Sequence, residues 1–529
     1  MADSFIEELL NVWSIRALIF AAAIIISAVV AWGAPVQAND DAQALLAKHR
    51  AFVGWQLEDG TFKTLRLERE YVNDKGKVTE RSVERHVGLL YRNTYTYPKR
   101  ANTTDETGFI GNVFWRSDMN GFTTPIYGDL AKYRLSAAAL FNEGLPSVGA
   151  TVLRSSTEDG RSTDIVHVQV PRADAVDLSI DPATGAIVKA VIDPGEDYET
   201  TYHILSYAEP IPGKKVIGSF RIGDAGGKFT YTRIEPNVVI SDGELHPPTP
   251  TASWAYTSSK PFPIQLTPTR IIVHATVDGT KGTFVLDTGA SEGIILNKAF
   301  ADRIGARDLH VPGQSLTLYD PTPIALRRVD TIEIGGNTLS NMIVEAVDFN
   351  NDFASRDYRG LDGKNYDGLI GYGLFAGAVV RIDSGAGTMT IDDPASFDPS
   401  GETGLPLLVD IASGIPSVPM TLDGSIAVKA YFDSGDPDTV IFGPDLIFKY
   451  HLSMGTKAER VAAGYGTIAC GTLAKLTLGP IVYTGVDACE RRTDVMSGRN
   501  ILVGLDFLRH FNMTFDYPHG RLFLQALHQ

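Results

Sequence analysis

The chain has 529 residues, of which 44% are hydrophobic and 21% charged, and its formal net charge is −16. This composition is that of a globular protein, and its acidity argues against a nucleic-acid partner, which would need a basic face. At roughly 150 residues per domain, the length predicts about three domains.

The first predicted element is an export segment over residues 1–38. An uncharged, mostly apolar stretch follows Arg16 and leads to Val36-Gln37-Ala38, a small-x-small cleavage site. The stretch is also long enough to span a bilayer, so residues 17–38 form either a cleaved signal peptide or a retained membrane tether. Both alternatives predict an exported protein, periplasmic or otherwise extracytoplasmic.

Residues 39–245 are predicted to form one helix followed by a large antiparallel sheet. The segment 41–52 has the spacing of an amphipathic helix, and from Phe62 onward the hydrophobic period changes to two. Consecutive prolines then break the pattern, as expected of an extended connector, and predict a Pro-rich linker over 246–262.

An internal repeat fills the rest of the chain and predicts two lobes, 263–399 and 400–529. Residues 283–290 and 429–436 each read as a strand that ends in Asp-(Thr/Ser)-Gly and precedes another apolar strand. Later in each lobe comes a pair of apolar residues followed by glycine, namely Ile370-Gly371 with Leu369 before it and Val503-Gly504 with Leu502 before it. Agreement at several fixed offsets is far more specific than one tripeptide.

Two other motif matches are interpreted as incidental. Asp383-Ser384-Gly385 has the same letters, but its place in the repeat corresponds to a terminal hairpin, so Asp383 is predicted to be a turn aspartate. Residues 289–293 fit G-x-S-x-G, yet that elbow needs a helix directly after the serine, and residues 294–296 read as a strand. The histidines show no metal-binding spacing, so no metal or cofactor is expected.

The paired segments resemble the retropepsin-like half-unit of aspartic proteases. Two diverged lobes in one chain resemble the pepsin arrangement, for which a monomer is sufficient. The resemblance implies a mainly β fold, with a bilobal aspartic-protease-like β-barrel region after the helix-plus-sheet domain. It also implies an aspartic endopeptidase whose partner is an extended peptide or protein substrate, bound like an added strand.

The expected chemistry explains the residue types. Two carboxylates about 3 Å apart share one proton, so that one can activate water and the other can protonate the leaving nitrogen. The resemblance assigns this dyad to Asp287 and Asp433. The loop residues that it assigns to support them are Thr288, Gly289, Ala290, Ser434 and Gly435, with Ile370, Gly371, Val503 and Gly504 on strands beside the loops.

Lobe 2 departs from the family at Asp436, where a small residue is usual, and Asp438 adds a further charge. A carboxylate there would raise the pKa values of the dyad or hinder substrate. The alternative is therefore a non-catalytic envelope protein that binds peptides or lipoproteins and has a degenerate second protease lobe. Gln314–Thr322 with Tyr319, and Gly464-Tyr465-Gly466, are candidate flaps or else ordinary hairpins.

Two expectations concern the remaining parts of the chain. If the protein is exported, Cys470 and Cys489 are expected to form a disulfide, the alternative being two buried free thiols. The domain over 39–245 loosely resembles the periplasmic lipoprotein carriers, whose open half-barrel wraps around a helix. Its concave face would then hold an acyl chain or an apolar peptide, unless the domain is a folding or targeting module without a ligand.

Overall fold

The computed structural model describes most of the chain after the export segment. The described residues are 40–97, 103–158, 160–194, 199–224, 226–291, 293–316, 321–349, 366–411, 413–443, 446, 458–462, 466–490 and 500–527. The predicted export segment, residues 1–38, lies outside them. None of the described helices has the length and apolar content that crossing a membrane requires. The predicted fold class, mainly β with barrel-like sheets in the C-terminal part, is confirmed.

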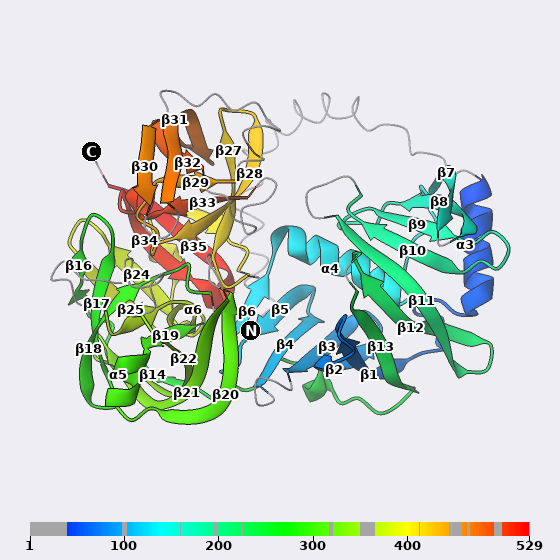
Figure 1. The fold of residues 1–529 in the computed structure, drawn as a ribbon, viewed down its shortest axis with the longest axis horizontal. Helices are drawn as coiled ribbons and strands as arrows, with labels where there is room; N and C mark the ends of the chain where they lie inside the picture. The colour runs from blue at the N-terminus through cyan, green and yellow to red at the C-terminus, as the bar shows by residue number, and fades with distance from the viewer. Residues whose placement is uncertain are drawn as a thin grey trace, which may run out of the picture.

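The N-terminal domain is one antiparallel sheet, shown at the right of Figure 1. Its first strand and its last strand pair with each other in the middle of the sheet, so the order is β6-β5-β4-β3-β2-β1-β13-β12-β11-β10-β9-β8-β7. The strands are β1 Thr64–Val72, β2 Val78–Val87, β3 Leu90–Tyr97, β4 Thr103–Ile110, β5 Val113–Ser117, β6 Thr123–Ile126, β7 Thr151–Glu158, β8 Arg161–Val168, β9 Val176–Ile180, β10 Ile187–Ile192, β11 Thr200–Ile211, β12 Lys214–Ile222 and β13 Lys228–Pro236.

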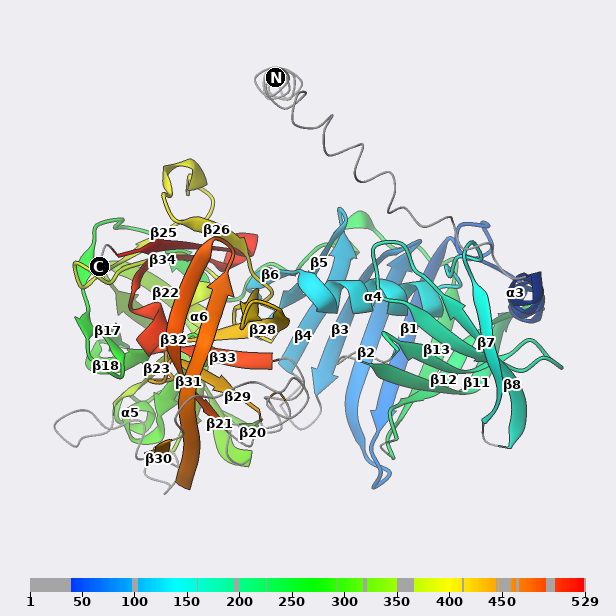
Figure 2. The same cartoon turned by 90° about the horizontal axis from the view of Figure 1, so that it is seen from above.

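Two of the described helices pack on this sheet, whereas the sequence predicted one. Helix α3, Asp40–Val53, is the predicted helix and buries Leu46 and Val53. Helix α4, Gly128–Phe141, is the helix that the sequence analysis missed; it lies along the sheet in Figure 2. Its N-terminal half packs on the apolar cluster of β3–β6 and its C-terminal half on that of β8–β12. Because α4 contacts both clusters, its apolar residues surround the helix instead of forming the single stripe that reveals an amphipathic helix.

The segment 246–262 is only partly the linker that was predicted. Strand β14, Ser253–Ala255, pairs with lobe 1, and strand β15, Phe262–Pro263, joins the sheet between the lobes. Short edge strands of this kind lack the alternating pattern that would identify them in a proline-rich stretch.

Each lobe has its own sheet, and a third sheet joins the lobes. In lobe 1 the strands are β16 Gln265–Leu266, β17 Ile271–Val277, β18 Thr280–Leu286, β19 Ile294–Asn297, β20 Arg307–Leu316, β21 Pro321–Ile334, β22 Asn337–Val347 and β23 Gly368–Ile370. In lobe 2 they are β27 Ser417–Leu422, β28 Ile426–Asp433, β29 Val440–Phe442, β30 Ala458–Ala462, β31 Gly466–Leu478, β32 Ile481–Glu490 and β33 Asn500–Gly504. The joining sheet has the order β15-β25-β24-β34-β35-β26, with β24 Val379–Asp383, β25 Thr388–Asp392, β26 Leu405–Leu408, β34 Phe511–Asp516 and β35 Arg521–Ala526.

The two lobes repeat one topology, strand by strand. In lobe 1, β17 and β18 form a hairpin, β18 runs parallel to β23, and β19 pairs antiparallel with β23 and parallel with β22. In lobe 2 the strands β27, β28, β33, β29 and β32 repeat these relations. Both hairpins turn at Asp-Gly with positive φ at both residues, as in the tight turns that such dipeptides favour.

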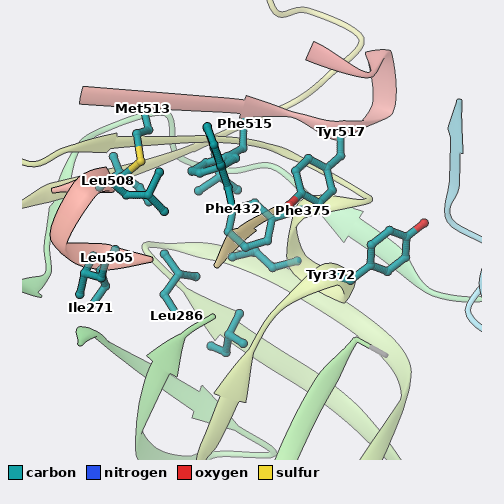
Figure 3. Close-up of a cluster of buried hydrophobic side chains, with 14 of the residues drawn as sticks. Ile271, Leu286, Tyr372, Phe375, Phe432, Leu505, Leu508, Met513, Phe515 and Tyr517 are labelled. Atoms are coloured by element: carbon teal, nitrogen blue, oxygen red, sulfur yellow. The ribbon is translucent and has the colours of Figure 1, made fainter. Parts of the chain in front are cut away.

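Short helices complete the framework. They are α5 Lys298–Arg303, α6 Tyr372–Phe375 and α8 Leu505–Leu508, with 3-10 turns η2 Asp242–Glu244, η3 Pro399–Gly401 and η4 Tyr517–His519. Figure 3 shows the apolar core at the joining sheet, where Leu286 of lobe 1 and Phe432 of lobe 2 lie in one cluster. These two residues directly precede the predicted dyad aspartates. The core therefore fixes both chains immediately before the site.

A disulfide joins Cys470 and Cys489, which lie opposite each other on β31 and β32 of lobe 2. We expect the double variant Cys470→Ala/Cys489→Ala to lose about 2–4 kcal/mol of unfolding free energy, because closing this loop restricts the unfolded chain. Guanidinium unfolding measures the loss. The wild type in excess reductant should match the variant, and an unchanged midpoint in both would contradict the expectation.

Candidate active site at the junction of the lobes

The two predicted aspartates lie at the same place in their lobes. Asp287 follows the last residue of β18, and Asp433 ends β28. Each side chain is 8% exposed, so both carboxyl groups are almost entirely removed from water. The parallel pairing of β18 with β23 and of β28 with β33 brings each Asp loop beside its apolar-glycine strand.

Reciprocal hydrogen bonds join the two loops through Thr288 and Ser434. The Thr288 hydroxyl donates to the Phe432 carbonyl at 2.7 Å and accepts from the Ser434 amide at 2.9 Å. The Ser434 hydroxyl donates to the Leu286 carbonyl at 2.9 Å and accepts from the Thr288 amide at 3.0 Å. All of these groups are buried, so breaking one bond would leave an unpaired polar group without water to replace its partner.

The glycine of each loop lies against the aspartate of the other lobe. A Cβ placed on Gly289 would lie 2.4 Å from the carboxyl group of Asp433, and one on Gly435 would lie 2.3 Å from that of Asp287. No side chain fits at such distances. The motif therefore needs glycine so that the two loops can approach closely enough for the carboxyl groups to meet.

Gly371 and Gly504 allow a second close approach within each lobe. A Cβ on Gly371 would lie 2.4 Å from the Ala290 carbonyl oxygen, and one on Gly504 would lie 2.2 Å from the Asp438 carbonyl oxygen. The preceding residues, Ile370 and Val503, are buried, and the Ile370 carbonyl accepts from the Asp287 amide at 2.9 Å. The apolar-glycine strand thus supports the Asp loop directly.

The electrostatics of the pair are governed by burial. Burial raises the pKa of Asp287, although amide donors from Gly289 and Ala290, at 2.8 and 3.1 Å, favour its ionised form. Burial, and then the adjacent charge of Asp287, raise the pKa of Asp433 to about 8. The two carboxyl groups are hydrogen-bonded to each other. Such a pair shares one proton between its two carboxyl groups over a broad pH range.

Arg270, just before β17, is a charged residue of this site that the sequence analysis did not select. Its side chain is buried, and its positive charge lowers the pKa of both aspartates, opposing the effect of burial. The strand registers make Ile415 its counterpart in lobe 2. Because the repeat puts an apolar residue there, comparing the two lobes gave no signal for Arg270.

Asp436, the residue that departs from the family pattern, lies buried after the lobe 2 motif. Its carboxylate accepts a hydrogen bond from the Asp438 amide at 2.9 Å, within its own loop. Among the neighbouring charges that raise the pKa of Asp433, the charge of Asp287 has the largest effect. The expected interference from Asp436 and Asp438 stays a prediction.

The two motif matches that were interpreted as incidental have the local structures that the sequence predicted. Asp383 ends β24, and its carboxylate accepts from the Ala386 amide at 2.8 Å, so it is a turn aspartate. After Ser291 the chain enters strand β19, whose last residue, Asn297, caps helix α5. No nucleophile elbow is present at this position. Among the described residues, no three His, Cys, Asp or Glu side chains gather as metal ligands would.

Both candidate flaps belong to hairpins. Strands β20 and β21 pair from Arg307 to Arg328, and β30 pairs with β31. Tyr319 and Tyr465 lie outside the described residues.

Comparison with known proteins identifies part of this region. Residues 273–374 match the family model described as aspartyl protease. The chain therefore contains an aspartyl protease-like region, which includes Asp287 and Gly371. No curated protein matches the chain. Among solved structures, a DUF1329 family protein from Desulfovibrio piger aligns over 40% of this chain and 98% of its own, with 13% identity and a TM-score of 0.29.

We expect Thr288→Val to lower the free energy of unfolding by about 2–4 kcal/mol, because it leaves the Phe432 carbonyl and the Ser434 amide buried and unpaired. Thr276→Val, on β17 of the same lobe, is the matched control and should cost less than about 0.5 kcal/mol. The loss in Thr288→Val/Ser434→Ala should be smaller than the sum of the single losses, since both act on one network. Equal costs for Thr288→Val and Thr276→Val in guanidinium unfolding would contradict the expectation.

Proposed function

We propose that this protein is an exported aspartic endopeptidase that hydrolyses peptide bonds with a water molecule activated by Asp287 and Asp433. The observation that carries the proposal is the cross-lobe contact of Gly289 and Gly435 with the opposite carboxyl groups. A turn aspartate with only a structural role would not need glycine against a second buried carboxyl group. The aspartyl protease match over residues 273–374 supports the same reaction class.

The chemistry follows from one shared proton. The ionised carboxylate of the pair takes a proton from water, and the oxygen so activated attacks the peptide carbonyl carbon. The protonated carboxyl hydrogen-bonds to the carbonyl oxygen, whose negative charge increases as the tetrahedral intermediate forms. A proton then passes to the nitrogen, the C–N bond breaks, and the pair returns to its single-proton state. The raised pKa of Asp433 supports one proton held by the pair at neutral pH.

Export is part of the proposal. Both cysteines of the chain are joined in one disulfide, and such bonds persist in oxidising compartments. Together with the apolar segment over residues 17–38, this favours an extracytoplasmic location, with the chain soluble or tethered at its N-terminus.

A second candidate is a peptide-binding envelope protein without turnover, and Asp436 is the feature that favours it. A third carboxyl group buried just after the lobe 2 motif is unusual for the family. Peptide binding without cleavage, unaffected by Asp287→Asn, would support this candidate over the endopeptidase.

We expect Asp287→Asn and Asp433→Asn each to reduce cleavage of an unfolded protein by at least about 10⁴-fold, since neither variant retains both an acid and a base. Asp383→Asn is the matched control, because Asp383 has the same motif letters in a turn, and it should retain full activity. A pepstatin-type inhibitor should block the wild type. Full activity in Asp433→Asn would refute the two-lobe mechanism.

The pH profile of kcat/KM should be bell-shaped. Activity should fall as pH rises through about 8, where the pair loses its remaining proton. On the acid side it should fall as pH drops through the raised pKa of Asp287, above the ordinary aspartate value of about 3.9. Initial rates from about pH 3 to pH 10 measure both limbs. An alkaline limb already complete at pH 6 would contradict the raised pKa of Asp433.

A further inference from the structure

The N-terminal domain is docked on the protease lobes through the β5–β6 hairpin. In the turn of this hairpin, Asn120 is 2% exposed, and its side chain makes two hydrogen bonds to the backbone of Ile343 on β22. The amide nitrogen of Asn120 donates to the Ile343 carbonyl at 3.1 Å, and its oxygen accepts from the Ile343 amide at 2.8 Å. Phe122, two residues later, belongs to the main apolar core of the lobes. The contact is therefore a buried interface, and Figures 1 and 2 show β6 beside the lobes.

A chain of hydrogen bonds leads from this hairpin to the Asp287 carboxylate. The hydroxyl groups of Thr124, on β6, and Tyr372 lie 3.0 Å apart, and both residues are fully buried. Tyr372 directly follows Gly371, and its amide donates to the Ala290 carbonyl at 3.0 Å. The Ala290 amide in turn donates to Oδ1 of Asp287 at 3.1 Å. Three hydrogen bonds, linked through the covalent structure of Tyr372 and Ala290, thus connect the N-terminal domain to one carboxyl group of the pair.

The same interface lies beside another buried aromatic residue, Tyr517, in the 3-10 turn η4 between β34 and β35. Tyr517 is fully buried, its ring lies 5.2 Å from that of Phe375 and 6.3 Å from that of Tyr372, and Figure 3 shows the three rings together. Nearby, a Cβ on Gly520 would lie 2.4 Å from the ring of Tyr127, so the end of the hairpin also fits closely against lobe 2. The N-terminal domain therefore contacts both lobes next to the site.

We propose that the N-terminal domain is a brace for the catalytic loop, and that Thr124 and Tyr372 are positioning residues of the reaction. This inference rests on the proposed function. Reacting groups must be held to within about half an ångström, and a loop is held that closely only when its supports are themselves fixed. Docking fixes Tyr372, Tyr372 fixes the Ala290 carbonyl, and the Ala290 amide then orients Asp287. Full activity accordingly requires the two parts of the chain to be docked.

The test is Thr124→Val in the full chain, which removes the hydroxyl and keeps the shape of the side chain. We expect kcat to fall by about three- to tenfold with KM nearly unchanged, as for the loss of one hydrogen bond that supports the transition state. Thr124→Ser, which restores a hydroxyl, should recover most of the rate. Tyr372→Phe removes the other hydroxyl and should behave like Thr124→Val.

Tyr256→Phe is the matched control. The Tyr256 hydroxyl donates to the Gly377 carbonyl, just beyond helix α6, but is not part of the chain of bonds to Asp287. Its loss should leave kcat unchanged. If Tyr256→Phe and Thr124→Val lower kcat equally, the effect is general packing and the brace is refuted.

Hydrogen exchange at the amides of Ala290 and Tyr372 gives a readout that needs no turnover. Both amides should exchange several-fold faster in Thr124→Val than in the wild type. In Tyr256→Phe their exchange rates should equal those of the wild type. If the wild type cleaves nothing, the proposed function fails, while faster exchange in Thr124→Val still supports the brace. Unchanged exchange in Thr124→Val and Tyr372→Phe overturns the brace, whatever the activity.

Discussion

The reciprocal hydrogen bonds between Thr288 and Ser434 are the constraint on which the site depends. Each hydroxyl donates a hydrogen bond to a carbonyl of the opposite lobe and accepts one from an amide of that lobe. All of these groups lie inside a buried core. Neither lobe can shift without leaving several polar groups unpaired away from water. This rigid junction allows Gly289 and Gly435 to lie against the opposite carboxyl groups, and so brings Asp287 and Asp433 together.

Bringing two carboxyl groups into one buried position has an electrostatic cost, and the surrounding groups limit it. Amide donors from each loop and the charge of Arg270 favour ionisation, whereas burial and the mutual repulsion of the aspartates oppose it. The balance leaves one proton on the pair, because removing both would place two negative charges in contact. A shared proton is the state from which acid and base catalysis can proceed at one site.

The N-terminal domain is coupled to this junction rather than attached by a loose connector. Its sheet places the β5–β6 hairpin at one edge, and the connector adds short strands to the sheets of the lobes. Through Asn120 and Thr124 the hairpin contacts lobe 1 beside the strand that supports the Asp287 loop. In the proposed mechanism, the domain therefore acts on the Asp287 loop by holding that strand in place.

The sequence by itself determined the mainly β class, the two repeated lobes, Asp287 and Asp433 as the paired positions, and Asp383 as a turn residue. Each of these follows from local patterns, namely strand, turn and glycine at fixed offsets, which a repeat displays twice. Only the tertiary structure decided that the charge of Arg270 acts on both aspartates, that Thr124 contacts Tyr372, and that α4 and the strands within 246–262 exist. These depend on contacts between segments far apart in the chain, and such contacts leave no periodic pattern in either partner.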